Sequence, residues 1–249
     1  MEKAENTGQN YGHLHPLSLV ILEINTIFSE MGFTVASGPE VETEFYNFDT
    51  LNIPEHHPAR DMWDTFWLKP YNARKLLRTH TSPVQVRFME KHEPPIRIIA
   101  PGRVFRHEAT DATHEAQFYQ LEGLVVGKGI SLAHLKSTLE IFLEKLFKKK
   151  TNIRLRPSFF PFVEPGVEVD MTCFKCDGKG CSTCKQSGYI EILGAGCVHP
   201  KVLISAGIDP NIYSGFAFGA GIDRIAMLKY GIDDVRVLYQ GDLRLINQF

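Results

Sequence analysis

Four of the five cysteines lie within twelve residues and form two CxxC pairs in immediate succession. The pairs are Cys173 with Cys176 and Cys181 with Cys184. Four thiolates match the tetrahedral coordination that Zn²⁺ prefers, and in a chain with no secretion signal such spacing indicates a metal before disulfides. We therefore predict that residues 172–188 form a small module that binds structural Zn²⁺, because four sulfurs leave no open position for catalysis. Reduced free thiols or a redox pair is the alternative.

A second candidate site is a row of polar side chains on two segments with strand character. If the segments pair as antiparallel strands joined by a polar loop, alternation places Arg106 and Glu108 on one face of the first strand. It places Phe118, Gln120 and Glu122 on one face of the second. A row of polar side chains that faces inward costs free energy unless the side chains hydrogen-bond to one another or to a polar ligand. Both alternatives remain open from the pattern alone.

A glycine-rich segment, GAGIDR at residues 219–224, follows an aromatic strand and opens a helix. It lacks the third glycine of a dinucleotide fingerprint and has no βαβ unit around it. Its glycines would allow the backbone to approach a ligand closely, and the guanidinium group of Arg224 could bind a phosphate. The alternative for Arg224 is a surface ion pair.

These residues need a scaffold, and apolar periodicity predicts three helices: from Pro16 to a stop at Gly32, from the N-cap Ser131 to Phe147, and after Gly221. Most segments with strand character follow one another directly, which favours an antiparallel sheet over a doubly wound one. The predicted class is α+β. The strand segments are 33–35, 97–99, 104–105, 118–126, 153–155, 189–193 and 216–218.

The composition suits a folded domain, with 249 residues of which 43% are hydrophobic. We expect a polar leader at residues 1–12 and one domain at 13–249. No stretch reaches the roughly 18 to 20 apolar residues of a membrane helix, so we expect a cytoplasmic protein without membrane contact. The formal charge of −2 argues against a strongly cationic nucleic-acid binder. The lysines at 145 and 148–150 could meet phosphate, but such a run is typical of a solvated helix end.

Three of these segments together resemble the signature motifs of the class II aminoacyl-tRNA synthetases. The motifs are a long interface helix, turn and strand carrying Pro39; an Arg-x-Glu strand, loop and aromatic-led return strand; and a glycine-rich strand and helix ending in Arg. Over residues 13–249 the sequence is more closely similar to the alpha subunits of phenylalanine tRNA ligases. That similarity lies in HHPARDMWDTFW (56–67), LRTHTSP (77–83), FFPFVEPG (159–166) and GFAFG (215–219).

The resemblance implies a class II synthetase fold, an antiparallel sheet flanked by helices, in which the cysteine module at 172–188 is an insertion. It also implies a two-step reaction. The carboxylate of L-phenylalanine attacks the α-phosphate of ATP to give the adenylate, and tRNA(Phe) then takes the acyl group. It implies Mg²⁺ as cofactor and a beta subunit as partner, in an (αβ)₂ assembly. The family's usual N-terminal helical hairpin that reaches tRNA is not in this sequence, so we expect tRNA charging to depend on the beta subunit. The alternative is a non-catalytic paralogue with a binding or regulatory role.

The resemblance also assigns residues. Arg106, Glu108 and Arg224 are the implied catalytic residues, and Glu164 would help to hold Mg²⁺. ATP would be bound by Arg106, Glu108, His114, Phe118 and Arg224. Phenylalanine would be bound by Trp63, His80, Ser82, Gln120, Glu122, Phe160, Phe162, Val163, Ala217 and Gly219. For the two phenylalanines of the 159–166 segment, ordinary core packing is the alternative.

Overall fold

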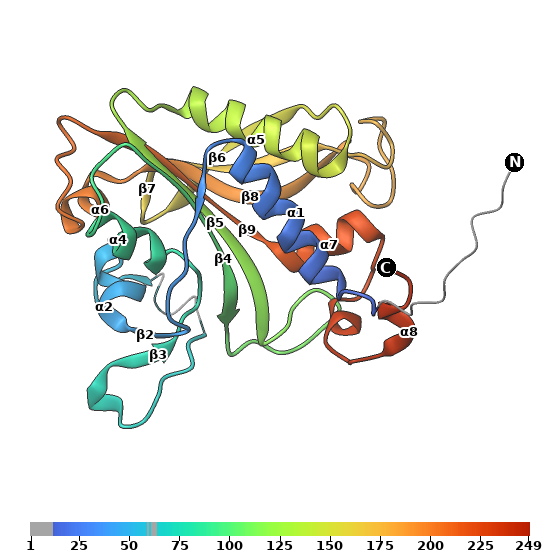
Figure 1. Ribbon diagram of the computed structural model, residues 1–249, viewed down its shortest axis with the longest axis horizontal. Helices are drawn as coiled ribbons and strands as arrows, with labels where there is room; N and C mark the ends of the chain where they lie inside the picture. Colours follow the sequence, from blue (N-terminus) through green and yellow to red (C-terminus); the bar gives the residue numbers. More distant parts are fainter. Residues whose placement is uncertain (1–11, 59, 61–63) are drawn as a thin grey trace, which may run out of the picture.

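A seven-stranded sheet forms the centre of the protein, in a computed structural model that describes residues 12–58, 60 and 64–249 (Figure 1). Its spatial order is β1-β4-β5-β9-β8-β7-β6. All neighbouring strands are antiparallel except β1 and β4, which are parallel. The strands are β1 (Thr34–Val35), β4 (Ile96–Phe105), β5 (Gln117–Gly127), β6 (Ile153–Phe160), β7 (Val163–Thr172), β8 (Tyr189–Val198) and β9 (Ser214–Gly221).

Three amphipathic helices cover one face of this sheet: α1 (Pro16–Glu30), α5 (Leu132–Phe147) and α7 (Ile222–Tyr230) (Figure 1). All three were predicted from their apolar spacing, and the structure confirms them. Proline at the first helical position suits the start of α1, because its fixed φ fits a helix and its missing N–H is not needed there. At the start of α5, Ser131 and His134 contact each other through Ser131 Oγ and His134 Nδ1, 2.9 Å apart.

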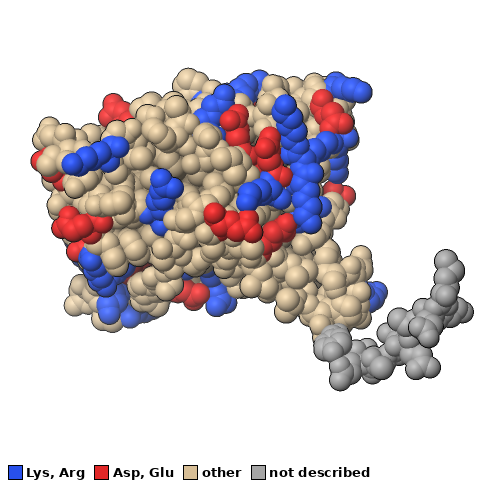
Figure 2. All heavy atoms as spheres, turned by 45° about the horizontal axis from the view of Figure 1, so that its top comes forward, with Lys and Arg blue, Asp and Glu red and all other residues tan. Residues whose placement is uncertain are grey.

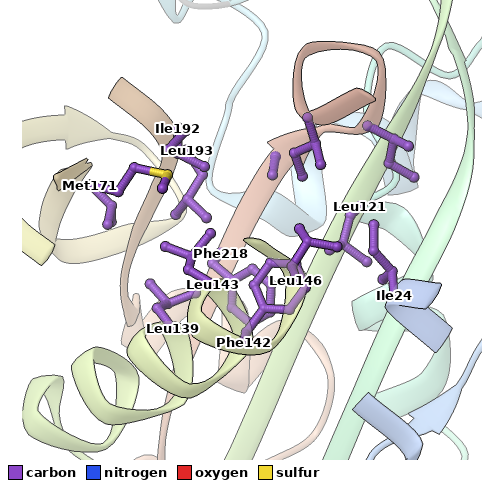
Figure 3. Packing of buried hydrophobic residues seen from close by; sticks show 14 of the residues in the cluster. Ile24, Leu121, Leu139, Phe142, Leu143, Leu146, Met171, Ile192, Leu193 and Phe218 are labelled. Atoms are coloured by element: carbon purple, nitrogen blue, oxygen red, sulfur yellow. The ribbon is translucent and has the colours of Figure 1, made fainter. Parts of the chain in front are cut away.

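The main core lies between these helices and the sheet and is centred on stacked aromatic rings (Figure 3). The ring of Phe28 on α1 lies 4.6 Å from that of Phe142 on α5 and 5.7 Å from that of Phe218 on β9. All three side chains are fully buried. Strand alternation brings Phe218 to this face and turns its neighbours Ala217 and Gly219 to the opposite face. The opposite face is therefore the one that carries small and polar side chains.

A second apolar cluster packs on the opposite face, under short elements that cover only part of it. It includes Leu51, Val84, Leu124 and Val126. The short elements that lie between β1 and β4 or follow β8 in the chain are β2 (Val41–Thr43), α2 (Glu44–Asn47), η1 (Asp49–Leu51), η2 (Tyr71–Ala73), β3 (Lys75–Leu77), α4 (Pro83–Met89) and α6 (Pro200–Ser205). Two further short helices follow α7, η3 (Val235–Leu238) and α8 (Leu243–Ile246). The uncovered remainder of this face holds the site described below.

The structure differs from the predicted strands of the central sheet in three places. The segments 97–99 and 104–105 are one continuous strand, β4, which ends at Phe105. Arg106 and Glu108 therefore lie beyond the strand rather than on one of its faces. The prediction missed β7, in which Pro165 and Gly166 interrupt the apolar pattern at a register shift. It also did not foresee the parallel β1–β4 pair, since β1 has only two residues.

Residues 173–188 connect β7 to β8 and contain the four clustered cysteines. The predicted leader falls almost entirely on residues 1–11, which lie outside the described part of the chain. On the face shown in Figure 2, lysine and arginine side chains are interspersed with aspartate and glutamate, which fits the small net charge. Among the described residues, no helix is long and apolar enough to cross a membrane.

We expect Phe142→Ala to lower the free energy of unfolding by about 3–5 kcal/mol, because a fully buried aromatic side chain leaves a cavity that its neighbours only partly fill. The adjacent Ile141 has 43% of its surface exposed, so Ile141→Ala is the matched control and should cost far less. Urea denaturation of both variants checks this. Equal losses would show that the aromatic stack does not carry the core.

Candidate active site

A cavity of about 350 Å³ opens on the sheet face that the three long helices do not cover. Its floor is built from β5 and β9, and its walls from β7, β8 and the turn between β6 and β7. The structure brings eight of the predicted site residues to its lining: Arg106, Gln120, Glu122, Phe160, Phe162, Val163, Ala217 and Gly219. The cavity therefore unites residues from two separate predicted motifs and the 159–166 segment.

The side chain of Glu122 lies at the base of the cavity and is almost fully buried. It accepts hydrogen bonds from Gln120 Nε2 at 2.6 Å and from Gln85 Nε2 at 2.8 Å. Burial raises the pKa of Glu122 to about 8, although these bonds, Ser82 and the charge of Arg106 act in the other direction. Near neutral pH the Glu122 carboxyl group is therefore protonated, and a nearby cation would favour its carboxylate form.

Gln120 offers a second acceptor. Its Nε2 group is bonded to Glu122, and in the described part of the chain its buried Oε1 atom has no hydrogen-bond partner. An unpaired buried carbonyl oxygen costs free energy until a donor reaches it. Because Gln120 lines the cavity, the natural donor is a ligand, such as an ammonium group.

Small residues on β9 keep the cavity open. A Cβ atom at Gly219 would lie 2.6 Å from Glu122 Oε1 and 3.1 Å from Gln120 Nε2, so even alanine there would displace the acceptors. Ala217 occupies the next position on the same face of the strand. Gly194 on β8 plays a similar part, since a Cβ atom there would lie 2.8 Å from Phe160 Cζ.

Aromatic side chains form the apolar wall. The rings of Phe160 and Phe162 lie 6.0 Å apart in a stacked arrangement. Both are only partly buried and border the cavity while also packing on the second core cluster. The two interpretations from the sequence, pocket lining and core packing, thus both describe these residues. An aromatic ligand ring would meet ring faces and edges here.

Arg106 lies where the polar and aromatic parts of the cavity meet. Its Nε donates to the carbonyl oxygen of Thr79 at 3.1 Å, and its Nη1 lies 3.9 Å from Glu108. The guanidinium carbon sits 5.0 Å from the centroid of the Phe118 ring. The structure thus gathers Arg106, Glu108 and Phe118 at one edge of the cavity, with a cation placed to meet an anion.

Two further predicted residues of the described part of the chain lie behind the lining. His80 and Ser82 are buried behind it, with the ring of His80 6.4 Å from that of Phe162. Burial and the charges of Arg106 and Arg78 lower the pKa of His80 to about 3, so it is neutral. Trp63 falls outside the described residues.

Three further predicted residues are exposed and lie outside this lining. The loop between β4 and β5 carries His114, whose Nδ1 lies 3.0 Å from Asp111 Oδ2. Arg224 is an exposed residue in the first turn of α7. Glu164 borders a different cavity, with Oε2 3.3 Å from His199 Nε2 and 75% of its side chain exposed. The structure does not bring Glu164 into the Arg106 cavity.

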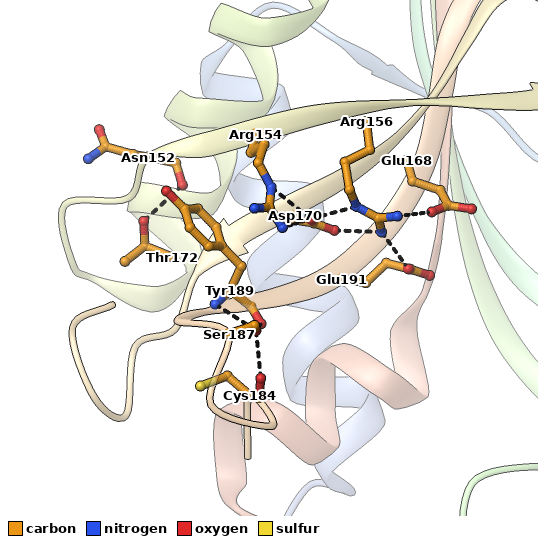
Figure 4. A network of polar contacts seen from close by, with 10 residues as sticks. All are labelled: Asn152, Arg154, Arg156, Glu168, Asp170, Thr172, Cys184, Ser187, Tyr189 and Glu191. Carbon is orange, nitrogen blue, oxygen red and sulfur yellow. Dashed lines mark hydrogen bonds and ion pairs between the residues drawn. The ribbon is translucent and has the colours of Figure 1, made fainter. Parts of the chain in front are cut away.

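Two carboxylates that the sequence analysis missed do line the Arg106 cavity, Glu168 on β7 and Glu191 on β8. Arg156 bridges them, with N–O distances of 2.7 and 2.8 Å, and also binds the buried Asp170 (Figure 4). Glu168 follows the predicted 159–166 segment by two residues. Its position in the cavity depends on strand β7, which the sequence pattern did not reveal.

The four clustered cysteines converge as predicted. Their sulfur atoms all lie within 4.8 Å of one another, and three pairs are 3.7–3.8 Å apart. With Zn–S bonds of about 2.3 Å, the sulfurs of a tetrahedral site are separated by about 3.8 Å. Backbone amides of Gly180 and Cys181 donate to Cys176 and Cys184 sulfurs, respectively, at 3.2 and 3.1 Å. This donor set fits a tetrahedral metal ion.

Comparison with known proteins agrees with this fold and site. The family model for tRNA synthetases class II core domain (F) matches residues 3–249. The chain is 60% identical to the phenylalanine–tRNA ligase alpha subunit of Bacillus subtilis (strain 168) over 240 residues, which cover 96% of this chain and 69% of that protein. It is 57% identical to the alpha subunit of Clostridium perfringens (strain ATCC 13124) over 97% of this chain and 70% of that protein.

Among solved structures, the pyrrolysyl-tRNA synthetase of Desulfitobacterium hafniense superposes with a TM-score of 0.67 at 20% identity, over 92% of this chain and 74% of that one. At this identity the likeness concerns the fold. The sheet, its flanking helices and the family match define a class II tRNA synthetase core domain. The identity to the bacterial alpha subunits goes further: the chain belongs to the phenylalanine–tRNA ligase alpha subunit family.

The raised pKa of Glu122 predicts that phenylalanine binding depends on pH. Below about pH 8 the carboxyl group is protonated in the free protein, and a bound ammonium group favours the carboxylate. Binding then releases a proton, so the affinity should rise with pH by up to about tenfold per unit between about pH 6 and 8. Titration calorimetry in two buffers of different ionisation enthalpy measures both affinity and proton release.

Glu122→Gln should bind more weakly and lose this pH slope. Glu168→Gln removes another carboxyl group of the same cavity and is the matched control, which should keep the slope. An unchanged slope in Glu122→Gln would assign the titration to another group.

Proposed function

We propose that this chain activates L-phenylalanine with ATP and transfers the aminoacyl group to tRNA(Phe), as the catalytic subunit of a phenylalanine–tRNA ligase. The observation that carries the proposal is the cavity itself. It combines acceptors for an ammonium group, an aromatic wall and an arginine at the edge where a carboxylate would emerge. Family membership supplies the reaction class.

For the amino acid, we assign the ammonium group to Glu122 and to the unpartnered Oε1 of Gln120. The ring would lie against Phe160 and Phe162, above the small residues of β9. Of the three further predicted contacts, His80 and Ser82 would act from behind the cavity lining, and Trp63 stays a prediction from the sequence. A neutral His80 fits this role, because it adds no positive charge that would repel the ammonium group.

For ATP, we assign the α-phosphate to Arg106 and the adenine face to Phe118. In the structure the Arg106 guanidinium lies over the Phe118 ring, so ATP binding would replace that contact by a stacked base and a bound phosphate. Arg224 would hold the far end of ATP, and Glu108 and His114 would lie beside the nucleotide.

The chemistry needs alignment and charge neutralisation more than a protein nucleophile. The attacking group is the substrate's own carboxylate, so the site must hold two anions in line and stabilise the negative charge that grows on phosphorus. Mg²⁺, when bound with ATP, supplies part of that neutralisation. A fixed guanidinium at Arg106 supplies the rest and can reach both the carboxylate and the α-phosphate.

For the metal, we retain Glu164 as a Mg²⁺ ligand in a site completed by another chain. Its carboxylate is an oxygen donor of the kind that Mg²⁺ accepts, and its exposure leaves room for further ligands. We propose a beta subunit as that other chain, in an (αβ)₂ assembly that binds tRNA(Phe) in the cytoplasm. A non-catalytic paralogue is the second candidate. The polar side chains of the cavity argue against it, because a protein without catalytic function has no physical need for them.

The first test is phenylalanine-dependent exchange of pyrophosphate into ATP by the chain assembled with a beta subunit. We expect exchange with phenylalanine and not with other amino acids, and a loss of about 100-fold or more in Arg106→Ala. Arg103→Ala is the matched control, because this nearby arginine is paired with Glu40 at 3.0 Å. No exchange by an assembly that demonstrably forms would favour the non-catalytic paralogue.

We also propose that the four-cysteine site binds structural Zn²⁺. The sulfur separations fit a tetrahedron, and all four positions are protein ligands, so the ion would join β7 to β8 without taking part in the reaction. Contacts to α5 seat the loop: the rings of Phe147 and Phe174 stack at 5.2 Å, and Lys149 Nζ donates to the Phe174 carbonyl oxygen at 3.0 Å.

Elemental analysis should therefore find one zinc per chain, and Cys181→Ser should lose it and lower the melting temperature by several degrees. Cys197→Ser, which changes the cysteine outside the cluster, is the control and should keep the metal. A wild-type protein that contains no zinc after purification with zinc present would leave the cluster as reduced thiols.

A further inference from the structure

The carboxylate of Asp223 joins three segments of the chain that are distant in sequence. It lies in the first turn of α7, directly before Arg224, and only 4% of its surface is exposed. Its Oδ2 accepts a hydrogen bond from the backbone amide of Tyr119 on β5 at 2.7 Å, and its Oδ1 accepts one from the hydroxyl of Tyr239. A buried carboxylate with two such donors is a fixed element of the structure.

The hydrogen bond from Tyr119 to Asp223 extends the β5–β9 pairing by one bond, with a side-chain acceptor in place of a backbone carbonyl. Pairing between these strands ends at Gln120 and Gly221, so the next amide on β5, that of Tyr119, has no carbonyl oxygen of β9 opposite to it. The chain turns into α7 at this point, and the Asp223 side chain accepts that amide hydrogen instead. The bond fixes the backbone beside Phe118 to the backbone beside Arg224.

The third segment, residues 235–239, is itself anchored on both sides. The amide of Val235 donates to the carbonyl oxygen of Ala112, in the loop between β4 and β5, at 2.9 Å. The carbonyl oxygen of Leu238 lies 2.8 Å from Nε2 of His15, at the start of α1. Tyr239 therefore reaches Asp223 from a segment that also holds the β4–β5 loop in place.

We propose that Asp223 and Tyr239 are positioning residues for the ATP site. They do not touch the nucleotide, and they fix the distance between Phe118 and Arg224, the two residues assigned to opposite ends of ATP. The proposal rests on the proposed function, because it takes those two assignments as its starting point. It assigns a role in ATP binding to the C-terminal segment, which lines no part of the amino-acid cavity.

Loss of the contact between Tyr239 and Asp223 should therefore affect the binding of ATP and not the binding of phenylalanine. Loss of the Tyr239 hydroxyl leaves one oxygen of a buried carboxylate without its donor and loosens the first turn of α7. The floor and the aromatic wall of the amino-acid cavity are held by other contacts. In the assembled ligase we therefore expect Tyr239→Phe to raise the KM for ATP about five- to tenfold and to leave the KM for phenylalanine within about twofold.

The matched control is Tyr46→Phe, which also removes a hydroxyl–carboxylate bond, the one from Tyr46 to Glu90 at 2.9 Å. It should leave both KM values unchanged. Pyrophosphate exchange with each substrate varied in turn gives these constants. Equal rises in both KM values for Tyr239→Phe, or no rise for ATP, would overturn the positioning role.

Two variants at Asp223 distinguish positioning from direct action on ATP or its metal. In Asp223→Asn the amide oxygen can accept from Tyr119 and the NH₂ group can donate to the Tyr239 oxygen, so we expect a KM for ATP close to the wild type. Asp223→Ala breaks both bonds and should raise it. If Asn is as damaging as Ala, the negative charge itself acts and the proposal is wrong.

Phe118→Leu and Arg224→Ala complete the series, because they test the ATP assignments themselves. If these two raise the KM for ATP and Tyr239→Phe does not, only the positioning role fails. If neither raises it, the proposed ATP site fails. A raised KM for ATP in all three, with the phenylalanine constant unchanged in Tyr239→Phe, supports both.

Discussion

The burial of the Glu122 carboxyl group is the constraint on which the rest of the site depends. An ionisable group on a sheet floor is tolerated only if its oxygens are bonded, and Gln85 and Gln120 supply those bonds from α4 and β5. The space above it exists because Gly219 carries no side chain. Acceptors, cavity and pKa are therefore one arrangement, and a change in any of its parts alters the others.

The two faces of the sheet differ, and this difference allows a buried ionisable group on one of them. Aromatic packing of Phe28, Phe142 and Phe218 seals one face against the helices and carries much of the hydrophobic stabilisation. The other face can then remain partly open and polar. Its far edge is held by a charge network in which Asp170 accepts from Arg154 and Arg156. That network spans β6, β7 and β8, and the cysteine loop joins the last two of these strands (Figure 4).

The likeness of this chain to a solved structure concerns the fold and not the side chains of the cavity. The solved synthetase with which this chain superposes shares only 20% of its residues, and the likeness lies in the arrangement of strands and helices. In this chain, the fold places alternate residues of β5 and β9 toward the cavity. We infer that specificity depends on which side chains occupy those positions, here Gln120, Glu122, Ala217 and Gly219.

The sequence by itself determined the local features: three helices from apolar spacing, the cysteine cluster from its CxxC pairs, and the β5 row of Phe118, Gln120 and Glu122 from alternation. Only the tertiary structure decided which distant residues share a cavity. Glu168 and Glu191 enter it through strand pairing, whereas Glu164, the neighbour of the cavity residue Val163 on β7, borders a different cavity. Periodicity reports which face of its own element a residue occupies, whereas strand order and register, set by packing across the whole chain, decide what that face meets.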